Sequence, residues 1–236
     1  MKLPSHGTIG VENVMYLFVL AALTLAALES LALWKNRFWL EVIAKPGVML
    51  VLFIWLFTSV GLNGPLLWFG VGILLSLAGD VFLMISLDRF FLAGLVVFLL
   101  AHIAYVIGFN LPLPALTSWG VILAILIGFG GARVIRRILS AVVANGQARM
   151  RIPIILYSMV ISLMLLSAAM KLADLTWNAG AALLVGFGAF LFYLSDIILA
   201  WNKFVTPIQH GRIYNIAAYH LGQIILIAGV ITQFRR

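Results

Sequence analysis

The sequence predicts an all-α polytopic membrane protein with about eight transmembrane helices. Of its 236 residues, 64% are hydrophobic and only 9% are charged, whereas soluble domains are about half apolar and about a quarter charged. The apolar residues fall into eight runs, most of them close to the ~20 residues that a helix needs to cross a bilayer. Basic residues lie in the gaps between these runs, which is how charge orients membrane helices. The net charge of +8 therefore does not indicate a nucleic-acid partner.

The spans form a single transmembrane domain over residues 1–236. They are predicted at residues 14–34, 46–60, 66–87, 91–110, 116–135, 154–172, 179–201 and 213–232. The first is longer than a signal-peptide core and no clear cleavage signal follows it, so we interpret it as a retained span. Pro46 suits the first turn of the second span, and the sequence GLNGP is a turn before the third. The fourth span ends at LPLP, because proline interrupts a helix.

The distribution of basic residues predicts the orientation. The gaps after the first, third, fifth and seventh spans hold 11 of the 15 Lys and Arg residues. Positive charge favours the cytoplasmic face, which puts both termini outside and the arginine-rich connection at 133–151 in the cytoplasm. We expect an integral protein of a bacterial inner membrane.

Two carboxylates lie inside otherwise apolar spans. Asp80 is in LSLAGDVFLMIS and Asp196 is in FLFYLSDIILAWNKF. An ionisable group in a bilayer is unfavourable unless it is paired or functional. Both aspartates should lie about 7–11 Å from the cytoplasmic boundary, given a rise of ~1.5 Å per residue. We expect them to face each other in one polar chamber, and a weak internal similarity also raises two parallel four-helix repeats as a hypothesis.

Ordered motifs along the chain indicate a family. The segments GDVFLMI, AHIAY, LSDIILA and IYNIAAYHLGQ, together with Lys45-Pro46, resemble the YhhN-type lysoplasmalogenases over about residues 12–232. Two positions depart from that pattern: His220 stands where a tyrosine is expected and Ala218 where a threonine is expected.

The resemblance implies an ether hydrolase that cleaves the vinyl-ether bond of a lysoplasmalogen to a fatty aldehyde and a glycerophospho-alcohol. Vinyl-ether hydrolysis needs one neutral acid and one base or charge stabiliser, as glycoside hydrolysis does. Asp80 and Asp196 are the predicted catalytic pair, with Asp80 slightly preferred as the acid because its sequence neighbours offer no donor to its ionised form. The predicted substrate-binding residues are Lys45, His102, Tyr105, Tyr219, His220 and Gln223.

No metal or cofactor is expected, and the partners are a lysophospholipid substrate and membrane lipid; the sequence gives no oligomeric state. Four other interpretations stay open. The two aspartates could be paired structural groups, and the same carboxylates could serve a proton-coupled transporter or a lipid-binding membrane protein. A metal-dependent lipid hydrolase is weakly indicated, since no His-x-x-x-His pair is present. Glu29, near the end of the first span, is expected to reach the membrane interface.

Overall fold

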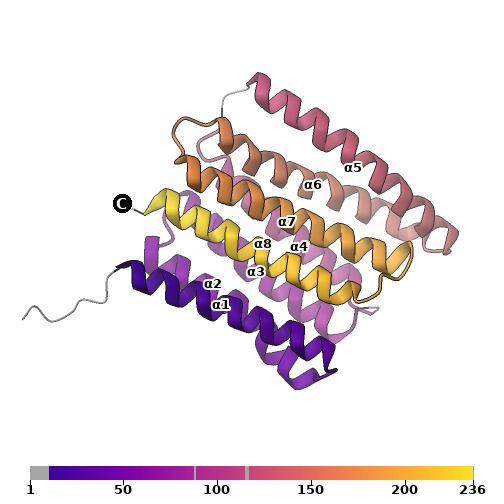
Figure 1. The fold of residues 1–236 in the computed structure, drawn as a ribbon. Helices are drawn as coiled ribbons and strands as arrows, with labels where there is room; N and C mark the ends of the chain where they lie inside the picture. The colour runs from indigo at the N-terminus through magenta and orange to yellow at the C-terminus, as the bar shows by residue number, and fades with distance from the viewer. Residues whose placement is uncertain (1–10, 88, 115–116, 236) are drawn as a thin grey trace, which may run out of the picture.

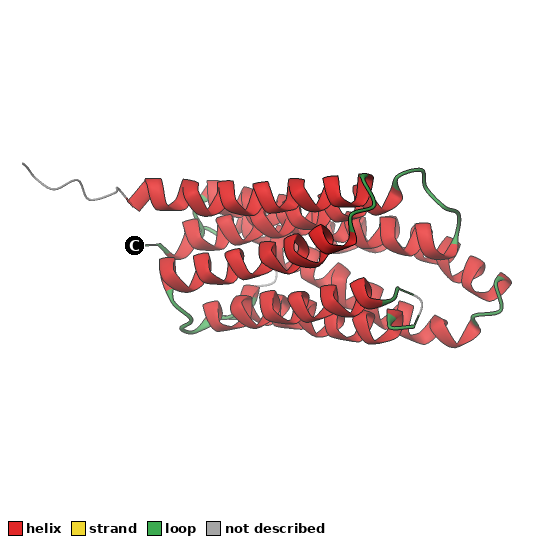
Figure 2. Cartoon of the chain, turned by 90° about the horizontal axis from the view of Figure 1, so that it is seen from below, coloured by secondary structure: helices red, strands yellow, loops and turns green. Residues whose placement is uncertain are grey.

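The structure, a computed structural model, describes residues 11–87, 89–114 and 117–235, and these form eight long α-helices. They are α1 (Val11–Trp34), α2 (Phe38–Val60), α3 (Pro65–Ile85), α4 (Phe91–Phe109), α5 (Ser118–Ala144), α6 (Arg151–Ala169), α7 (Ala179–Phe204) and α8 (Gly211–Phe234). Short 3-10 helices, Ala148–Met150 and Met170–Ala173, flank α6. The described residues contain helices and loops only (Figure 2). The all-α prediction is confirmed.

All eight helices are long and apolar enough to cross a membrane. They run alongside one another in a bundle, and α1 begins at the same end at which α8 finishes (Figure 1). Large apolar side chains such as Leu17, Leu20 and Phe129 are exposed on the outside of the bundle. Such a surface is unsuited to water and suited to lipid chains. The prediction of an integral membrane protein is therefore confirmed.

The predicted start of the second span is wrong. The helix α2 begins at Phe38 instead of residue 46, so Pro46 and Lys45 lie inside it. The prediction excluded residues 38–45 because charged residues are unfavourable in a membrane helix. Glu41 and Lys45 are nevertheless buried in α2, because each has an oppositely charged partner on another helix.

The predicted end of the fifth span is also wrong, because α5 continues nine residues beyond 135 to Ala144. Arg133, Arg136 and Arg137 therefore lie on the helix and not in a connection. Long arginine side chains can reach the interface from a helix that extends past the hydrocarbon. The predicted start at residue 116 lies outside the described residues, and the other span ends agree to within three residues.

The closest helix pair is α7 with α8, and glycine makes it possible. A Cβ atom on Gly188 would lie 2.5 Å from the backbone nitrogen of Leu226 and 2.7 Å from the carbonyl oxygen of Gly222. Backbone atoms cannot move aside as a side chain can. Small residues at such crossings allow the dispersion contacts that hold membrane helices together.

We predict that Gly188→Ala destabilises the bundle by about 1–3 kcal/mol, the usual effect of overpacking. Gly186→Ala is the matched control, because its Cβ would meet only Leu172 Cδ1, at 3.9 Å. Thermal unfolding in detergent should show a lower midpoint for the first variant alone. Equal midpoints for both variants would mean that the α7–α8 contact is not this close.

Candidate functional site

The sequence predicts that the buried polar side chains of the spans converge on one pocket. The structure instead gives these side chains separate sets of partners. In the part of the chain that the structure describes, the predicted site residues and Glu29 fall into four hydrogen-bonded sets. One surrounds Asp80, the second surrounds Asp196, the third is the pair of Glu29 and His220, and the fourth joins Tyr105 to Gln223.

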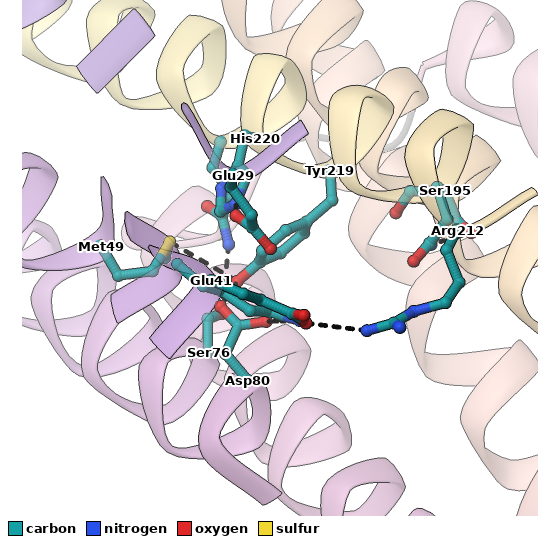
Figure 3. Close-up of polar contacts among 12 residues, drawn as sticks. Glu29, Glu41, Met49, Ser76, Asp80, Ser195, Arg212, Tyr219 and His220 are labelled. Carbon is teal, nitrogen blue, oxygen red and sulfur yellow. Dashed lines mark hydrogen bonds and ion pairs between the residues drawn. The ribbon is translucent and has the colours of Figure 1, made fainter. Parts of the chain in front are cut away.

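Asp80 is held by donors from two other helices. Lys45 Nζ of α2 lies 3.4 Å from Asp80 Oδ1, and the Tyr219 hydroxyl of α8 donates to Oδ2 at 2.8 Å. Figure 3 shows Tyr219 reaching from α8 toward Asp80. The sequence neighbours of Asp80 offer no donor, and its donors come from distant helices instead. The preference for Asp80 as the acid stays a prediction.

A chain of neutral hydrogen bonds connects three neighbouring side chains of the bundle core. The Tyr105 hydroxyl donates to Gln223 Oε1 at 2.8 Å, and Gln223 Nε2 donates to Ser76 Oγ at 3.1 Å. All three residues are fully buried. Tyr105 and Gln223, both predicted to bind substrate, thus satisfy each other across α4 and α8.

Glu29 and His220 form a fully buried pair between α1 and α8. His220 Nε2 contacts Glu29 Oε2, and both side chains have 0% exposure. Figure 3 places this pair beside Tyr219 and above Asp80. The expectation that Glu29 reaches the interface is wrong, because His220 gives it a partner inside the bundle. The histidine that departs from the family pattern is thus matched to a carboxylate on α1.

Asp196 has different partners. The Tyr157 hydroxyl of α6 donates to Asp196 Oδ2, and His102 Nε2 of α4 lies 3.3 Å from the same oxygen. His102 Nε2 is also 3.0 Å from the Tyr157 oxygen, which can accept a hydrogen bond from it. His102 Nδ1 is buried without a partner among the described residues. Because an unpaired buried N–H is unfavourable, the geometry favours the tautomer that carries its proton on Nε2.

An apolar cavity of about 280 Å³ lies beside Asp196. Its walls come mainly from α4, α5, α6 and α7, and include Phe98, Ile135 and Ile161. Asp196 is one of its few polar lining residues, and the side chain of Asp196 is 15% exposed. Asp196 Oδ2 is engaged by Tyr157 and His102, whereas Oδ1 has only a long contact of 3.4 Å from Ser195 Oγ. Among the described residues, Oδ1 is thus the less strongly held of the two carboxyl oxygens.

The structure does not bring the two aspartates together. Asp80 is 2% exposed and does not line this cavity, and the two carboxylates share no hydrogen-bond partner among the described residues. The Phe192 ring connects their surroundings, with its centroid 5.2 Å from that of Tyr219 and 4.6 Å from that of His102. In place of the face-to-face arrangement expected from the sequence, the two aspartates have separate partners, and Phe192 contacts one partner of each.

The residues considered for a metal site are also separated. His102 is with Asp196, His220 is with Glu29, and Asp80 is with Lys45. Within the described ranges, no three His, Asp or Glu side chains are grouped so that they could hold a metal ion.

A second cavity, of about 580 Å³, lies at the end of the bundle where α4 and α8 finish. Its polar lining includes Lys171 and Asp174, whose side chains are 3.1 Å apart. Partial burial raises the pKa of Asp174, but hydrogen bonds from Thr176 and Lys171 outweigh it and hold this pKa below its usual value. The pair is already satisfied, and none of the predicted site residues lines this cavity.

Tyr157 is the member of the Asp196 group that the sequence prediction missed. A tyrosine in an apolar run is typical of a core residue. The sequence alone does not show which face of α6 meets α7. Depth was the available signal, because Tyr157 lies near the start of α6 and Asp196 lies near the end of α7, at the same end of the bundle.

We predict that Asp80→Asn destabilises the protein by about 3–5 kcal/mol, because it leaves the Lys45 ammonium buried without its counter-charge. Adding Lys45→Met should restore most of the lost stability by removing that charge. The measurement is thermal unfolding of the single and double variants in detergent. A double variant no more stable than Asp80→Asn would show that the ion pair does not account for the loss.

Comparisons with known proteins agree with the family resemblance that the sequence motifs indicate. The human protein named Lysoplasmalogenase TMEM86A is 28% identical over 66% of this chain, which spans 62% of that protein's length. The rat protein named Lysoplasmalogenase TMEM86B is 30% identical over 80% of this chain and 72% of its own length. No solved structure matches the chain. The YhhN family matches residues 40–230, and this chain therefore belongs to the YhhN family.

Proposed function

We propose that this protein hydrolyses the vinyl-ether bond of lysoplasmalogens within the membrane, and that Asp196 supplies the proton. The observation that carries this proposal is the position of Asp196. Its carboxyl group lies in the wall of an apolar cavity, and Tyr157 and His102 hold that group in place. The names of the family relatives support the choice of substrate.

The cavity suits the hydrocarbon part of such a substrate. Its lining is mostly aliphatic and aromatic, which favours an alkenyl chain through the burial of apolar surface. The group that reacts is an uncharged ether next to that chain. A lipid with its chain in the cavity would therefore bring a neutral reactive group beside Asp196.

The chemistry requires one proton and one water molecule. In the proposed first step the protonated Asp196 Oδ1 gives its proton to the outer alkene carbon, and the ether carbon becomes an oxocarbenium ion. The new carboxylate faces that cation and stabilises it. Water then adds to the ether carbon and returns a proton to Asp196, as an acid that becomes a base does in glycoside hydrolysis. The hemiacetal collapses to the aldehyde and the glycerophospho-alcohol.

Tyr157 and His102 act on Asp196 in this scheme. The Tyr157 hydroxyl donates to Oδ2, and His102 Nε2 lies within 3.3 Å of the same oxygen. This arrangement orients the carboxyl group so that Oδ1 is the oxygen that exchanges protons with the substrate. It also stabilises the negative charge that forms on Asp196 after the first step.

Asp80 has a positioning role in this proposal. Its carboxylate holds Tyr219, whose ring packs on Phe98 at 5.8 Å between centroids. Phe98 in turn lines the cavity. Loss of Asp80 would therefore affect the shape of the cavity through Tyr219, and not the proton transfer itself.

We predict that Asp196→Asn lowers the turnover of a lysoplasmalogen by about two to four powers of ten, the usual contribution of general acid catalysis. The assay is the release of fatty aldehyde by purified protein, with thermal unfolding as the check on folding. Asp174→Asn is the matched control, a carboxyl-to-amide change at the other cavity, and it should retain activity. Turnover like wild type in a folded Asp196→Asn protein would overturn the proposal.

We also propose that the connection between α5 and α6 faces the cytoplasm of a bacterial cell and that the termini are outside, as the basic residues indicate. A single cysteine, Gln147→Cys, tests this cleanly, because the chain has no cysteine of its own. In intact cells it should resist an impermeant thiol reagent and react once the membrane is opened. Reaction in intact cells would invert the orientation.

A further inference from the structure

The helix α5 is held to the bundle mainly near its two ends. Its buried residues are Gly120, close to its start, and Ile138 and Val142, close to its end. The helix lies at the edge of the bundle, with α6 and α7 as its neighbours (Figure 1). Between the two anchored ends, α5 supplies one wall of the cavity beside Asp196. This wall is thus made by the least enclosed span of the protein.

Exposed residues of α5 and α6 form part of the cavity lining. Among the described lining residues, Gly128 of α5 and Met159 of α6 are the two that are exposed. Both lie in apolar spans, on a surface that lipid chains would cover. We define the side opening as the gap whose rim is Gly128 and Met159.

Small residues keep this side opening wide. Gly128 and Gly131 on α5, and Ser158 and Ser162 on α6, all line the cavity. A Cβ atom on Gly131 would approach the Tyr193 hydroxyl at 2.9 Å, so that glycine is explained by packing. A Cβ atom on Gly128 would meet nothing within 4 Å. Packing within the protein therefore gives no reason for a glycine at 128, where a side chain would project into open space at the cavity rim.

We propose that the side opening admits the hydrocarbon chain of a single-chain lipid directly from the bilayer, and that Gly128 determines how thick a chain can enter. This inference rests on the proposed function for the identity of the substrate. The surroundings argue for the occupant: the rim is apolar and faces the hydrocarbon of the bilayer, where acyl and alkenyl chains are the available partners. A charged head group would be strongly disfavoured at this rim and would stay at the membrane surface.

Gly128→Leu tests the proposal, with Gly130→Leu as the matched control. Both glycines lie on α5 with no atom within 4 Å of an added Cβ, but only Gly128 lines the cavity. The two variants therefore change helix propensity and surface equally and differ in whether they fill the side opening. We expect Gly128→Leu to lower kcat/KM for a lysoplasmalogen by about tenfold or more, the range seen when a methylene group or more is misplaced in an apolar pocket. Gly130→Leu should behave like wild type.

A binding measurement separates this inference from the proposed function. The probe is a saturated alkyl-ether lysophospholipid that carries a photoreactive diazirine in its chain. Because it has no vinyl-ether bond, the protein cannot hydrolyse it by the proposed reaction. In wild type and Gly130→Leu it should label cavity residues of α5 or α6, and labelling should fall about tenfold or more in Gly128→Leu. If wild type is labelled there but releases no aldehyde from lysoplasmalogen, the proposed function fails and the side opening stands.

Equal labelling and equal turnover in Gly128→Leu and Gly130→Leu would overturn the side opening. If Gly128→Leu does not fold, Met159→Trp fills the opposite rim. Leu156→Trp is then the control, because Leu156 is exposed on α6 but does not line the cavity. The same difference between rim and control is expected, and its absence would overturn the inference.

Discussion

The arrangement of this bundle depends on one constraint: each ionisable side chain inside the hydrocarbon needs a partner, because water is not there to provide one. Lys45 and Tyr219 satisfy Asp80, and Tyr157 and His102 satisfy Asp196. These contacts join α2, α3 and α8 on one side and α4, α6 and α7 on the other. Apolar packing between membrane helices is weakly specific, so polar pairs of this kind define which faces meet.

The two aspartates show how similar sequence surroundings can lead to different environments. Asp80 does not line the cavity and is paired with Lys45, whereas Asp196 lines an apolar cavity and accepts from Tyr157 and His102. The contacts of Asp80 with Lys45 and Tyr219 join α2, α3 and α8, which suits a structural role. A carboxyl group that lines a cavity and is held by tyrosine and histidine suits the transfer of a proton.

The sequence is sufficient to predict the eight helices and the presence of two aspartates inside them, because both follow from local patterns of hydrophobicity. It could not predict the pairs, since a partner's position depends on which face of a distant helix turns inward. The sequence predicts Lys45 outside its helix, because its partner Asp80 lies on a different helix. It predicts Glu29 at the interface for the same reason, since the partner His220 lies 191 residues away in the chain. Depth alone relates Tyr157 to Asp196 in the sequence, because the sequence does not show which face of α6 meets α7.

Whether a fixed acid in the cavity delivers the proton can be tested by hydrolysing a lysoplasmalogen in heavy water and trapping the aldehyde at once by reduction. A carboxyl group held on one side of the bound alkene predicts one deuterium at the carbon next to the aldehyde carbon, in a single configuration. An equal mixture of the two configurations, or no deuterium at that carbon, would contradict the role of Asp196.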